Sequence, residues 1–281
     1  MTAVVDVTLD VAPGEVLGIA GPNGAGKSTI IAMLLGFLDP DTGSVALGGM
    51  APRAFVEQEG VAFLPELMTL PLSWRADEAL RRLAALSGIP AAARAAAVER
   101  AIDLVGIGEH RAKKLKALSK GNLQRVGLAH ALLADRRVVV FDEPTHGLDP
   151  LWTARFRTLV GDLRRADRAM VIASHNLDEL ERLCDRVAII DRGRIQRVVS
   201  VRDAAGSHET RRWRIQAAAG IEALAAAFDG AVIQGMSMEC SADLAALNRG
   251  LAAAIAQGAM VAAVIPAESS LEEAFRSAVS Q

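Results

Sequence analysis

Short continuous apolar runs recur along the first 200 residues, and most are followed by a longer stretch with helical spacing. Uninterrupted runs of this length are typical of strands buried on both faces, as in a parallel sheet. Strands alternating with helices indicate an α/β fold. The pattern also predicts a half-buried alternating strand over 4–11 and a short strand over 44–47. The buried strands are predicted at 16–20, 60–64, 137–141, 169–173 and 187–190.

From 73 to about 117 the pattern changes, because helical spacing dominates and no strand-length apolar run occurs. We expect helices over 77–86 and 90–105, with breaks at Ser87-Gly88 and Gly106, since glycine favours a helix end. Further helices are predicted over 123–133 and 151–165. The region of about 73–122 is therefore predicted to be a helical insertion within the α/β domain.

A second, smaller unit is predicted beyond residue 206. Its strand and helix patterns follow each other in the order β-α-β-α-β, which indicates a small two-layer α+β domain. Ser270 and Glu273 have the spacing of a capping box and predict a terminal helix. The expected domains are 1–206 and 207–281. The elements of the second are predicted at 212–216, 221–228, 231–238, 241–257 and 260–265.

The strand at 16–20 runs directly into a glycine-rich loop and then into a helical pattern. Strand, glycine-rich loop and helix form the context of a phosphate-binding loop (P-loop). The glycines let several N–H groups face one point, and the positive end of the helix dipole adds to them. Lys27 adds a full charge, and Ser28 offers a hydroxyl to Mg²⁺. The nucleotide-binding loop is Gly21, Pro22, Asn23, Gly24, Ala25, Gly26, Lys27, Ser28 and Thr29.

Composition narrows the setting of this site. The formal net charge of −2 favours neither nucleic acid nor acidic lipid as a partner. Cys184 and Cys240 lack metal-ligand spacing and are expected to be free thiols in a reducing compartment. No signal-peptide pattern begins the chain, and the apolar stretch 251–266 is too short and interrupted to span a membrane. We expect a soluble protein whose membrane role, if it has one, depends on a partner.

The strand at 137–141 ends in Asp142-Glu143, which supplies a second element for a phosphate site. Ligands of open α/β sheets bind at the carboxyl ends of the strands, so these carboxylates are expected beside the P-loop. Asp142 is predicted to hold Mg²⁺ with Ser28, and Glu143 to accept a hydrogen bond from the attacking water. Positioning and charge stabilisation do most of the work in phosphoryl transfer.

Three further motifs resemble those of ATP-binding cassette (ABC) ATPases. Ser119-Lys120-Gly121-Asn122 resembles the family's signature, and 143–150 resembles the end of its Walker B strand and its D-loop. His175, after an apolar strand, matches the switch histidine. The resemblance covers about 4–200. It implies a P-loop NTPase core that binds ATP and Mg²⁺ and hydrolyses ATP.

The resemblance also implies a role for each matched residue. Ser119 and Gly121, at the start of a helix, are expected to meet the γ-phosphate bound by another copy, so two chains form two sandwiched sites. His175 is expected to contact the γ-phosphate and hold Glu143 and the water in line. Asp149 is expected to cross the dimer interface, and it also suits a helix N-cap.

Three positions depart from the family pattern. Glu66 stands where a glutamine is usual, and its carboxylate still suits Mg²⁺; the alternative is an exposed loop residue. The signature has Lys120 and Asn122 in place of glycine and glutamine, although the serine and second glycine are kept. No aromatic residue precedes the first strand to stack on adenine, which predicts weaker nucleotide binding.

We therefore expect the ATPase subunit of an ABC exporter. It is predicted to act as a homodimer or with a related subunit, at the cytoplasmic face of the membrane, under a separate transmembrane permease. Residues 67–72 with Trp74 are expected either to receive a helix of that permease or to pack within the insertion. Arg212 and Arg214 indicate a solvated strand face more than a lipid contact. The alternatives are a soluble ABC switch acting on ribosomes or DNA, a degenerate cassette with an active partner, and a small-molecule P-loop kinase.

Overall fold

The computed structural model describes residues 3–201, 211–267 and 270–279, which form two compact units. The first unit is Met1–Ser200 and the second is Val201–Gln281. The predicted boundary between 206 and 207 lies outside the described residues. Within those residues, no helix is long and apolar enough to cross a membrane.

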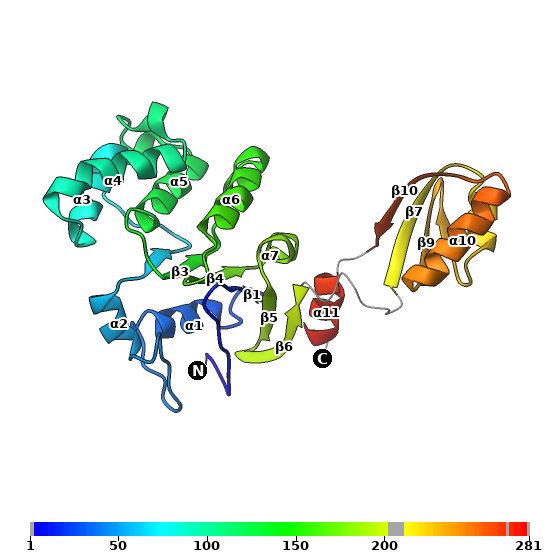
Figure 1. The fold of residues 1–281 in the computed structure, drawn as a ribbon, viewed down its shortest axis with the longest axis horizontal. Helices are drawn as coiled ribbons and strands as arrows, with labels where there is room; N and C mark the ends of the chain where they lie inside the picture. Colours follow the sequence, from blue (N-terminus) through cyan, green and yellow to red (C-terminus); the bar gives the residue numbers. More distant parts are fainter. Residues whose placement is uncertain (1–2, 202–210, 268–269, 280–281) are drawn as a thin grey trace. The chain divides into compact units, whose positions relative to one another are not determined.

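The first unit is built on a six-stranded sheet with the strand order β2-β3-β4-β1-β5-β6 (Figure 1). The first five strands are parallel, and β6 pairs antiparallel with β5 through a hairpin at Arg192-Gly193. Both turn residues have positive φ, 47° and 75°, which suits a two-residue hairpin loop. The strands are β1 (Val16–Ala20), β2 (Ala62–Leu64), β3 (Val138–Asp142), β4 (Ala169–Ser174), β5 (Arg186–Asp191) and β6 (Arg194–Ser200).

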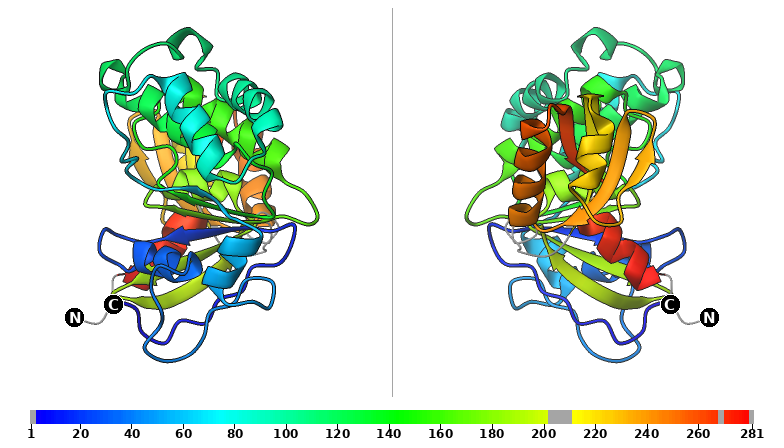
Figure 2. Two further views of the ribbon diagram at one scale, coloured as in Figure 1. Left: turned by 90° about the vertical axis from the view of Figure 1, so that its left-hand side faces the viewer. Right: turned by 90° about the vertical axis from the view of Figure 1, so that its right-hand side faces the viewer.

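Helices cover both faces of this sheet, which explains why its central strands are continuous apolar runs (Figures 1 and 2). Ile30 and Ile31 of α1 pack with Val140 on one face, and Phe156 of α6 lies 5.8 Å from Phe141 on the other. Gly18 allows α7 to approach β1, because a Cβ there would lie 3.0 Å from Cys184 Sγ. These helices are α1 (Lys27–Leu34), α2 (Pro52–Gln58), α6 (Pro150–Leu163) and α7 (Leu177–Leu183).

The predicted helical insertion is present between β2 and β3. It contains α3 (Ala76–Leu86) and α4 (Ala91–Leu104), two short 3₁₀ turns (Gly108–His110 and Leu115–Ala117) and α5 (Lys120–Ala131). Arg125 joins its parts: the guanidinium donates to the carbonyls of Val105 and Gly106 and lies 3.8 Å above the Trp152 ring. The insertion is therefore tied to α6.

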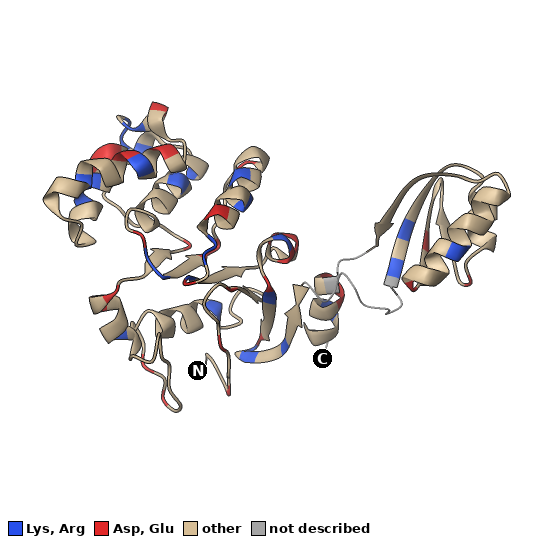
Figure 3. Cartoon of the chain, viewed as in Figure 1, with Lys and Arg blue, Asp and Glu red and all other residues tan. Residues whose placement is uncertain are grey.

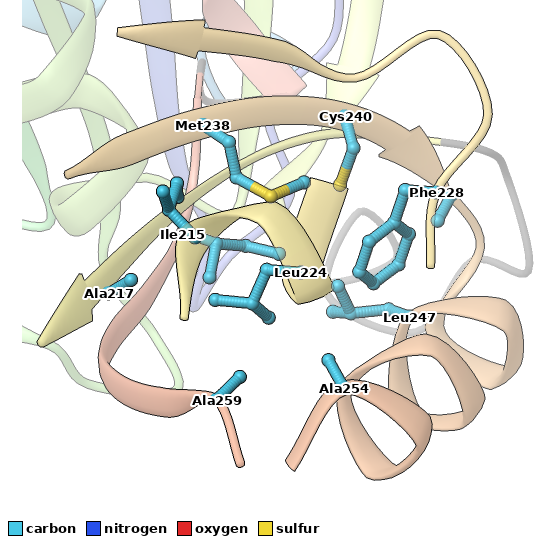
Figure 4. Close-up of a cluster of buried hydrophobic side chains, with 11 residues drawn as sticks. Ile215, Ala217, Leu224, Phe228, Met238, Cys240, Leu247, Ala254 and Ala259 are labelled. Carbon is cyan, nitrogen blue, oxygen red and sulfur yellow. The ribbon is translucent and has the colours of Figure 1, made fainter. Parts of the chain in front are cut away.

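In its described residues, the second unit contains a four-stranded antiparallel sheet with the order β10-β7-β9-β8, together with the helices α9 and α10. Its chain order β-α-β-β-α-β, with each helix crossing over a strand, is the split β-α-β arrangement of ferredoxin-like folds. Leu224, Phe228 and Met238 lie in its own apolar core (Figure 4). A terminal helix, α11 (Ser270–Val279), follows. The other elements are β7 (Arg211–Ala219), α9 (Ile221–Ala226), β8 (Val232–Gln234), β9 (Ser237–Ala242), α10 (Leu244–Ala256) and β10 (Met260–Pro266).

The basic positions of β7, visible in Figure 3, belong to a strand face with ion pairs. Arg212 and Arg214 lie 3.0 and 2.7 Å from the carboxylate of Glu239 on the neighbouring strand. Cross-strand pairs of opposite charge stabilise a sheet modestly. This agrees with the expected solvated strand face.

Three local predictions were wrong. Residues 4–11 alternate in burial but form no strand, because Asp6 has φ of +53° and a left-handed residue interrupts a ladder. Residues 44–47 contribute only an isolated bridge between Leu47 and Met50. The single strand predicted over 231–238 is two strands, β8 and β9, separated by a turn at Gly235, whose φ is +63°.

Candidate functional site

Three parallel strands deliver the candidate residues to one edge of the sheet. β1 ends at Ala20 before the P-loop, β3 ends at Asp142, and β4 ends at Ser174 before His175. The register pairs Ala20 with Ser174, and Asp142 with Ala173. Because carboxyl ends of parallel strands meet at one edge, segments more than 100 residues apart converge here.

The P-loop has an open cradle bounded by tightly packed glycines. Gly24 has φ of +81°, and a Cβ there would meet nothing within 4 Å. A Cβ at Gly21 would lie 2.4 Å from the carbonyl oxygen of Ile190, so only glycine fits. Gly26 precedes α1 with φ of +109° and has no side chain to cap the helix. The first N–H groups of α1 therefore remain available to an anion.

Lys27 is buried, with 7% of its surface exposed, and is directed at the loop itself. Its Nζ donates to the carbonyl oxygens of Gly21 at 2.7 Å and Pro22 at 3.3 Å. The same atom is 3.9 Å from Glu143 Oε1. The next residue, Ser28, donates from Oγ to Asp142 Oδ2 at 3.3 Å. The predicted P-loop and acidic residues are thus brought together.

Glu143 is held in a strained backbone conformation with its carboxylate fixed. Its φ is +48°, a left-handed value that is uncommon for a residue with a side chain. The carboxylate accepts hydrogen bonds from Ser174 Oγ at 3.1 Å and from the backbone N–H of His175 at 3.0 Å. The His175 ring contacts it as well, with Nδ1 2.9 Å from Oε2. Strain of this kind persists where the surroundings fix it, and it concentrates at functional sites.

The electrostatics of this edge favour binding of a cation. The pKa of Asp142 is raised to about 6, mainly by burial. The charges of Glu143 and Glu66 also raise this pKa, whereas the Ser28 hydrogen bond and Lys27 lower it. A buried carboxyl beside a hydroxyl is a suitable partial ligand set for Mg²⁺, which usually takes one or two protein oxygens together with phosphates and water. Ser28 and Asp142 therefore fit that ion.

The signature residues form a second group, at the start of α5. Ser119 is the N-cap, and its Oγ accepts from the N–H of Asn122 at 3.2 Å. The Asn122 side chain in turn accepts from Arg125 at 2.8 Å. Gly121 packs against the D-loop segment 146–149, because a Cβ there would lie 2.7 Å from the Gly147 carbonyl oxygen. Lys120 also contacts this segment, with Nζ 2.7 Å from His146 Nε2.

The remaining predicted residues have mixed surroundings. Asp149 is the N-cap of α6, and its carboxylate accepts from the N–H of Trp152 at 2.9 Å. The residue is exposed. Glu66 is exposed in the loop after β2, yet its charge reaches Asp142. In the apolar segment after it, Leu67 and Leu72 are 70% and 53% exposed, whereas Trp74 stacks with Arg82 at 4.7 Å.

Sequence reasoning missed two residues that support Glu143. Ser174 bonds its carboxylate, and buried Gln124 donates from Nε2 to the carbonyl oxygens of Glu143 and Pro144 at 3.3 and 3.2 Å. Ser174 ends a predicted apolar strand and Gln124 follows the signature, so the sequence shows where both lie along the chain. The sequence does not show that their side chains point toward Glu143. The segment before β1 runs beside the P-loop. The N–H of Val5 donates to the carbonyl oxygen of Gly193 at 2.8 Å, and Ala3 lies beside Gly26. Neither Ala3 nor Val5 is aromatic, so neither can stack on adenine.

Comparison with known proteins gives consistent results. The profile of the ABC transporter family matches residues 4–146. An ABC transporter ATP-binding protein of Nostoc is 37% identical over 205 residues, which are 72% of this chain and 61% of that protein. Another, from Bacillus subtilis, is 31% identical over 282 residues, covering 96% of this chain and 88% of its own. The Nod factor export ATP-binding protein I of Burkholderia pseudomallei is 37% identical over 194 residues, 67% and 62% of the two chains. Two of these three matches, to the Nostoc and Burkholderia proteins, span less than two thirds of the relative.

Solved structures show the same fold. An ATP-binding subunit of an ABC transporter aligns with a TM-score of 0.65 at 27% identity, covering 72% of this chain and 85% of its own. A dimeric ATP-binding cassette in a post-hydrolysis state with ADP and Pi aligns with a TM-score of 0.65 at 21% identity. From the family profile, the relatives and the P-loop sheet edge together, this chain belongs to the ABC transporter ATP-binding proteins.

Proposed function

We propose that this protein binds ATP with Mg²⁺ and hydrolyses it to ADP and phosphate. The observation that carries the proposal is the buried Glu143 carboxylate, held by Ser174 and His175 at the edge where the P-loop opens. A carboxylate with a fixed direction, close to a phosphate cradle, is what orientation of an attacking water requires.

Each residue has a definite part in this proposal. The N–H groups of 21–29 bind the β- and γ-phosphates, and Lys27 leaves the carbonyl oxygens of Gly21 and Pro22 to pair with them. Ser28 and Asp142 hold Mg²⁺, which neutralises charge on the phosphates. Glu143 accepts a hydrogen bond from the water, and exposed His175 contacts the γ-phosphate while keeping Glu143 in line.

We also propose that the active form contains two copies, or this chain and a related subunit. Ser119 and Lys120 are exposed at the start of α5 and Asp149 is exposed at the start of α6, so a second chain is able to reach them. In this arrangement Ser119, Lys120, Gly121 and Asn122 of one copy complete the nucleotide site of the other, and Asp149 lies at the interface.

ATP hydrolysis is proposed to drive transport through a separate transmembrane permease, with this subunit at the cytoplasmic face of the membrane. The exposed side chains of Leu67 and Leu72 support contact with an apolar helix of that permease, near Glu66. Export is the proposed direction, in keeping with the relative named for Nod factor export. The unit at 207–281 is proposed to be an accessory domain.

Replacing Glu143 by glutamine tests the catalytic assignment. Glutamine keeps the size and the acceptor oxygen but lowers the basicity, so kcat should fall roughly 10²- to 10⁴-fold while ATP binding is retained. Steady-state phosphate release measures kcat, and calorimetric titration with Mg·ATP measures ATP binding. Size-exclusion chromatography with ATP should show a trapped dimer. Unchanged phosphate release in this variant would refute the role of Glu143.

A further inference from the structure

Lys120 and His146 join two segments that are 26 residues apart in the chain. Lys120 is the first residue of α5, and His146 lies in the loop between β3 and α6. The Nζ and Nε2 atoms are 2.7 Å apart. The lysine stem covers Gly147, where a Cβ would lie 2.9 Å from Lys120 Cγ. The Lys120–His146 pair therefore closes the start of the signature helix onto the loop that begins at Glu143.

The chemistry of the pair defines the state of the histidine. A lysine ammonium offers only donors, so Nε2 of His146 must be the unprotonated nitrogen that accepts. The ring is then neutral and carries its proton on Nδ1. A protonated ring would place two positive charges 2.7 Å apart. The contact is thus an ammonium donating to a neutral acceptor.

Two other contacts between the same segments involve a buried side chain and tight backbone packing, so they are harder to replace. Gln124, with 6% of its surface exposed, donates to the carbonyl oxygens of Glu143 and Pro144. Gly121 packs on the Gly147 carbonyl with no space for a side chain. Lys120, by contrast, is exposed and has a flexible stem. Its contact with His146 is the one that a competing acceptor can replace.

His146 is directly linked to the catalytic carboxylate's backbone. Its N–H donates to the Glu143 carbonyl oxygen at 3.1 Å, which closes the turn that starts at Glu143. Glu143 is in the left-handed region, with φ of +48°, and depends on such contacts to remain there. A change in what holds the His146 ring therefore acts on the turn that positions Glu143.

We propose that Lys120 exchanges His146 for the terminal phosphate of the nucleotide held by the second copy. The exchange releases His146 and adjusts the turn that carries Glu143 of the same chain. The inference rests on the proposed function, in which the start of α5 meets that phosphate. An anionic phosphate oxygen is a stronger acceptor for an ammonium than a neutral imidazole is. Lys120 is then a phosphate-binding residue and His146 a positioning residue, and nucleotide arrival at one site is conveyed to the hydrolytic residue of the other.

The pair itself is tested by NMR of the full chain with ¹⁵N-labelled histidine, with the His146 signals assigned by His146→Gln. Without nucleotide, Lys120→Met should shift the Nε2 signal, and Lys116→Met, at an exposed lysine four residues earlier in the chain, should leave it unchanged. Adding Mg·ATP to Glu143→Gln should shift the signal in the same direction as Lys120→Met does. The proposal is overturned if Lys120→Met leaves the Nε2 chemical shift unchanged. It is also overturned if that shift stays unchanged while ATP causes the chain to dimerise.

The exchange is tested by sedimentation of ATP-dependent dimers in the Glu143→Gln background. Lys120→Met should raise the ATP concentration needed for dimers about tenfold or more, because a charged hydrogen bond is lost. His146→Leu should lower it, because Lys120 no longer has to leave a partner. The double variant should match Lys120→Met alone, and His146→Gln, a neutral acceptor, should match the parent.

A purely structural pair predicts that both single variants raise the ATP requirement, and that outcome overturns the exchange. If Glu143→Gln forms no dimers with ATP at all, the two-copy form of the proposed function fails and the exchange between copies fails with it. The NMR comparison without nucleotide still decides whether the Lys120–His146 pair forms, so the two failures are distinguishable.

Discussion

The neighbouring carboxylates of Asp142 and Glu143 differ in how many hydrogen-bond partners the protein gives them. Glu143 accepts from Ser174, from the His175 backbone and contacts the His175 ring, so its charge is distributed over several partners. Asp142 is 6% exposed and accepts from the Ser28 hydroxyl. Burial consequently dominates at Asp142 and raises its pKa to about 6. A carboxyl in that condition gains most from a divalent cation, which is consistent with the proposed binding of Mg²⁺.

The raised pKa of Asp142 has a testable consequence for stability. The folded-state pKa of about 6 exceeds the value of 3.8 for a free side chain, so between these pH values the folded chain keeps a proton that the unfolded chain loses. Stability without metal and nucleotide should therefore fall as pH rises through this window. Asp142→Asn lacks this penalty and should be more stable than the parent above pH 6, by at most about 3 kcal/mol, with the difference vanishing near pH 4.

Urea unfolding in EDTA at several pH values measures this difference. Asp41→Asn removes the same charge at an exposed position and is the matched control. A stability difference between Asp142→Asn and the parent that is the same at pH 4.5 and pH 7.5 would contradict the assignment of the shift to burial.

Helix α5 connects the insertion to α6 and to the loop that begins at Glu143, and Arg125 is its central contact. Arg125 is 8% exposed, and its guanidinium donates to Val105, Gly106 and Asn122 and stacks on Trp152. Glycine suits position 106 beside it, since φ there is +56° and a Cβ would lie 3.0 Å from the Trp152 ring. The end of α4, the start of α5 and the first turn of α6 are thus held by one planar group with several donors.

Arg125→Lys should destabilise the fold by roughly 2–4 kcal/mol, although it conserves charge. Lysine has neither the planar fork nor the reach to satisfy three acceptors, and its buried ammonium is left underbonded. Arg155→Lys is the matched control, because Arg155 is exposed and only 5.1 Å above the same Trp152 ring. Urea midpoints of the two variants provide the comparison. Equal urea midpoints for the two variants would show that the hydrogen bonds of Arg125 add nothing to stability beyond the stacking of its charge on Trp152.

Continuous apolar strands were the most predictable elements, and they carried the candidate site with them. β1 is a buried run that ends directly before the P-loop, and β3 and β4 are buried runs that end at Asp142 and Ser174. The sequence therefore already placed Lys27, Asp142, Glu143 and His175 after the carboxyl ends of these strands. Burial on both faces leaves a strong local pattern because every position in the run must be apolar.

What the sequence did not disclose depends on contacts between distant segments or on left-handed residues. Residues 4–11 alternate like a strand, but Asp6 at φ +53° interrupts the ladder. The turn at Gly235 was hidden within a run that looks like one strand. Gln124 and the Lys120–His146 pair connect α5 with a loop about 20 residues later, and no periodicity records such a partner.

The two compact units have separate apolar cores, which sets an expectation for how the chain unfolds. The core of the second unit includes Leu224, Phe228 and Met238, all at most 8% exposed, and Figure 4 shows their side chains converging between the sheet and its helices. The first unit has its own core under the P-loop, around Ile19 and Val140. Nucleotide binds only the first unit in the proposed function, so ligand linkage separates the two.

Calorimetry should therefore resolve two transitions, and Leu224→Ala should lower only one of them. Truncating a fully buried leucine typically costs about 2–5 kcal/mol, which is large for a unit of this size. Phe156→Ala, in the first unit, should lower the other transition. Mg·ATP at about 100 times its Kd should raise that same transition by about 2.7 kcal/mol of stability and leave the Leu224 transition in place. If Leu224→Ala and Phe156→Ala shifted a single shared transition, the units would unfold as one, and the second unit would have to be treated as part of the ATPase core.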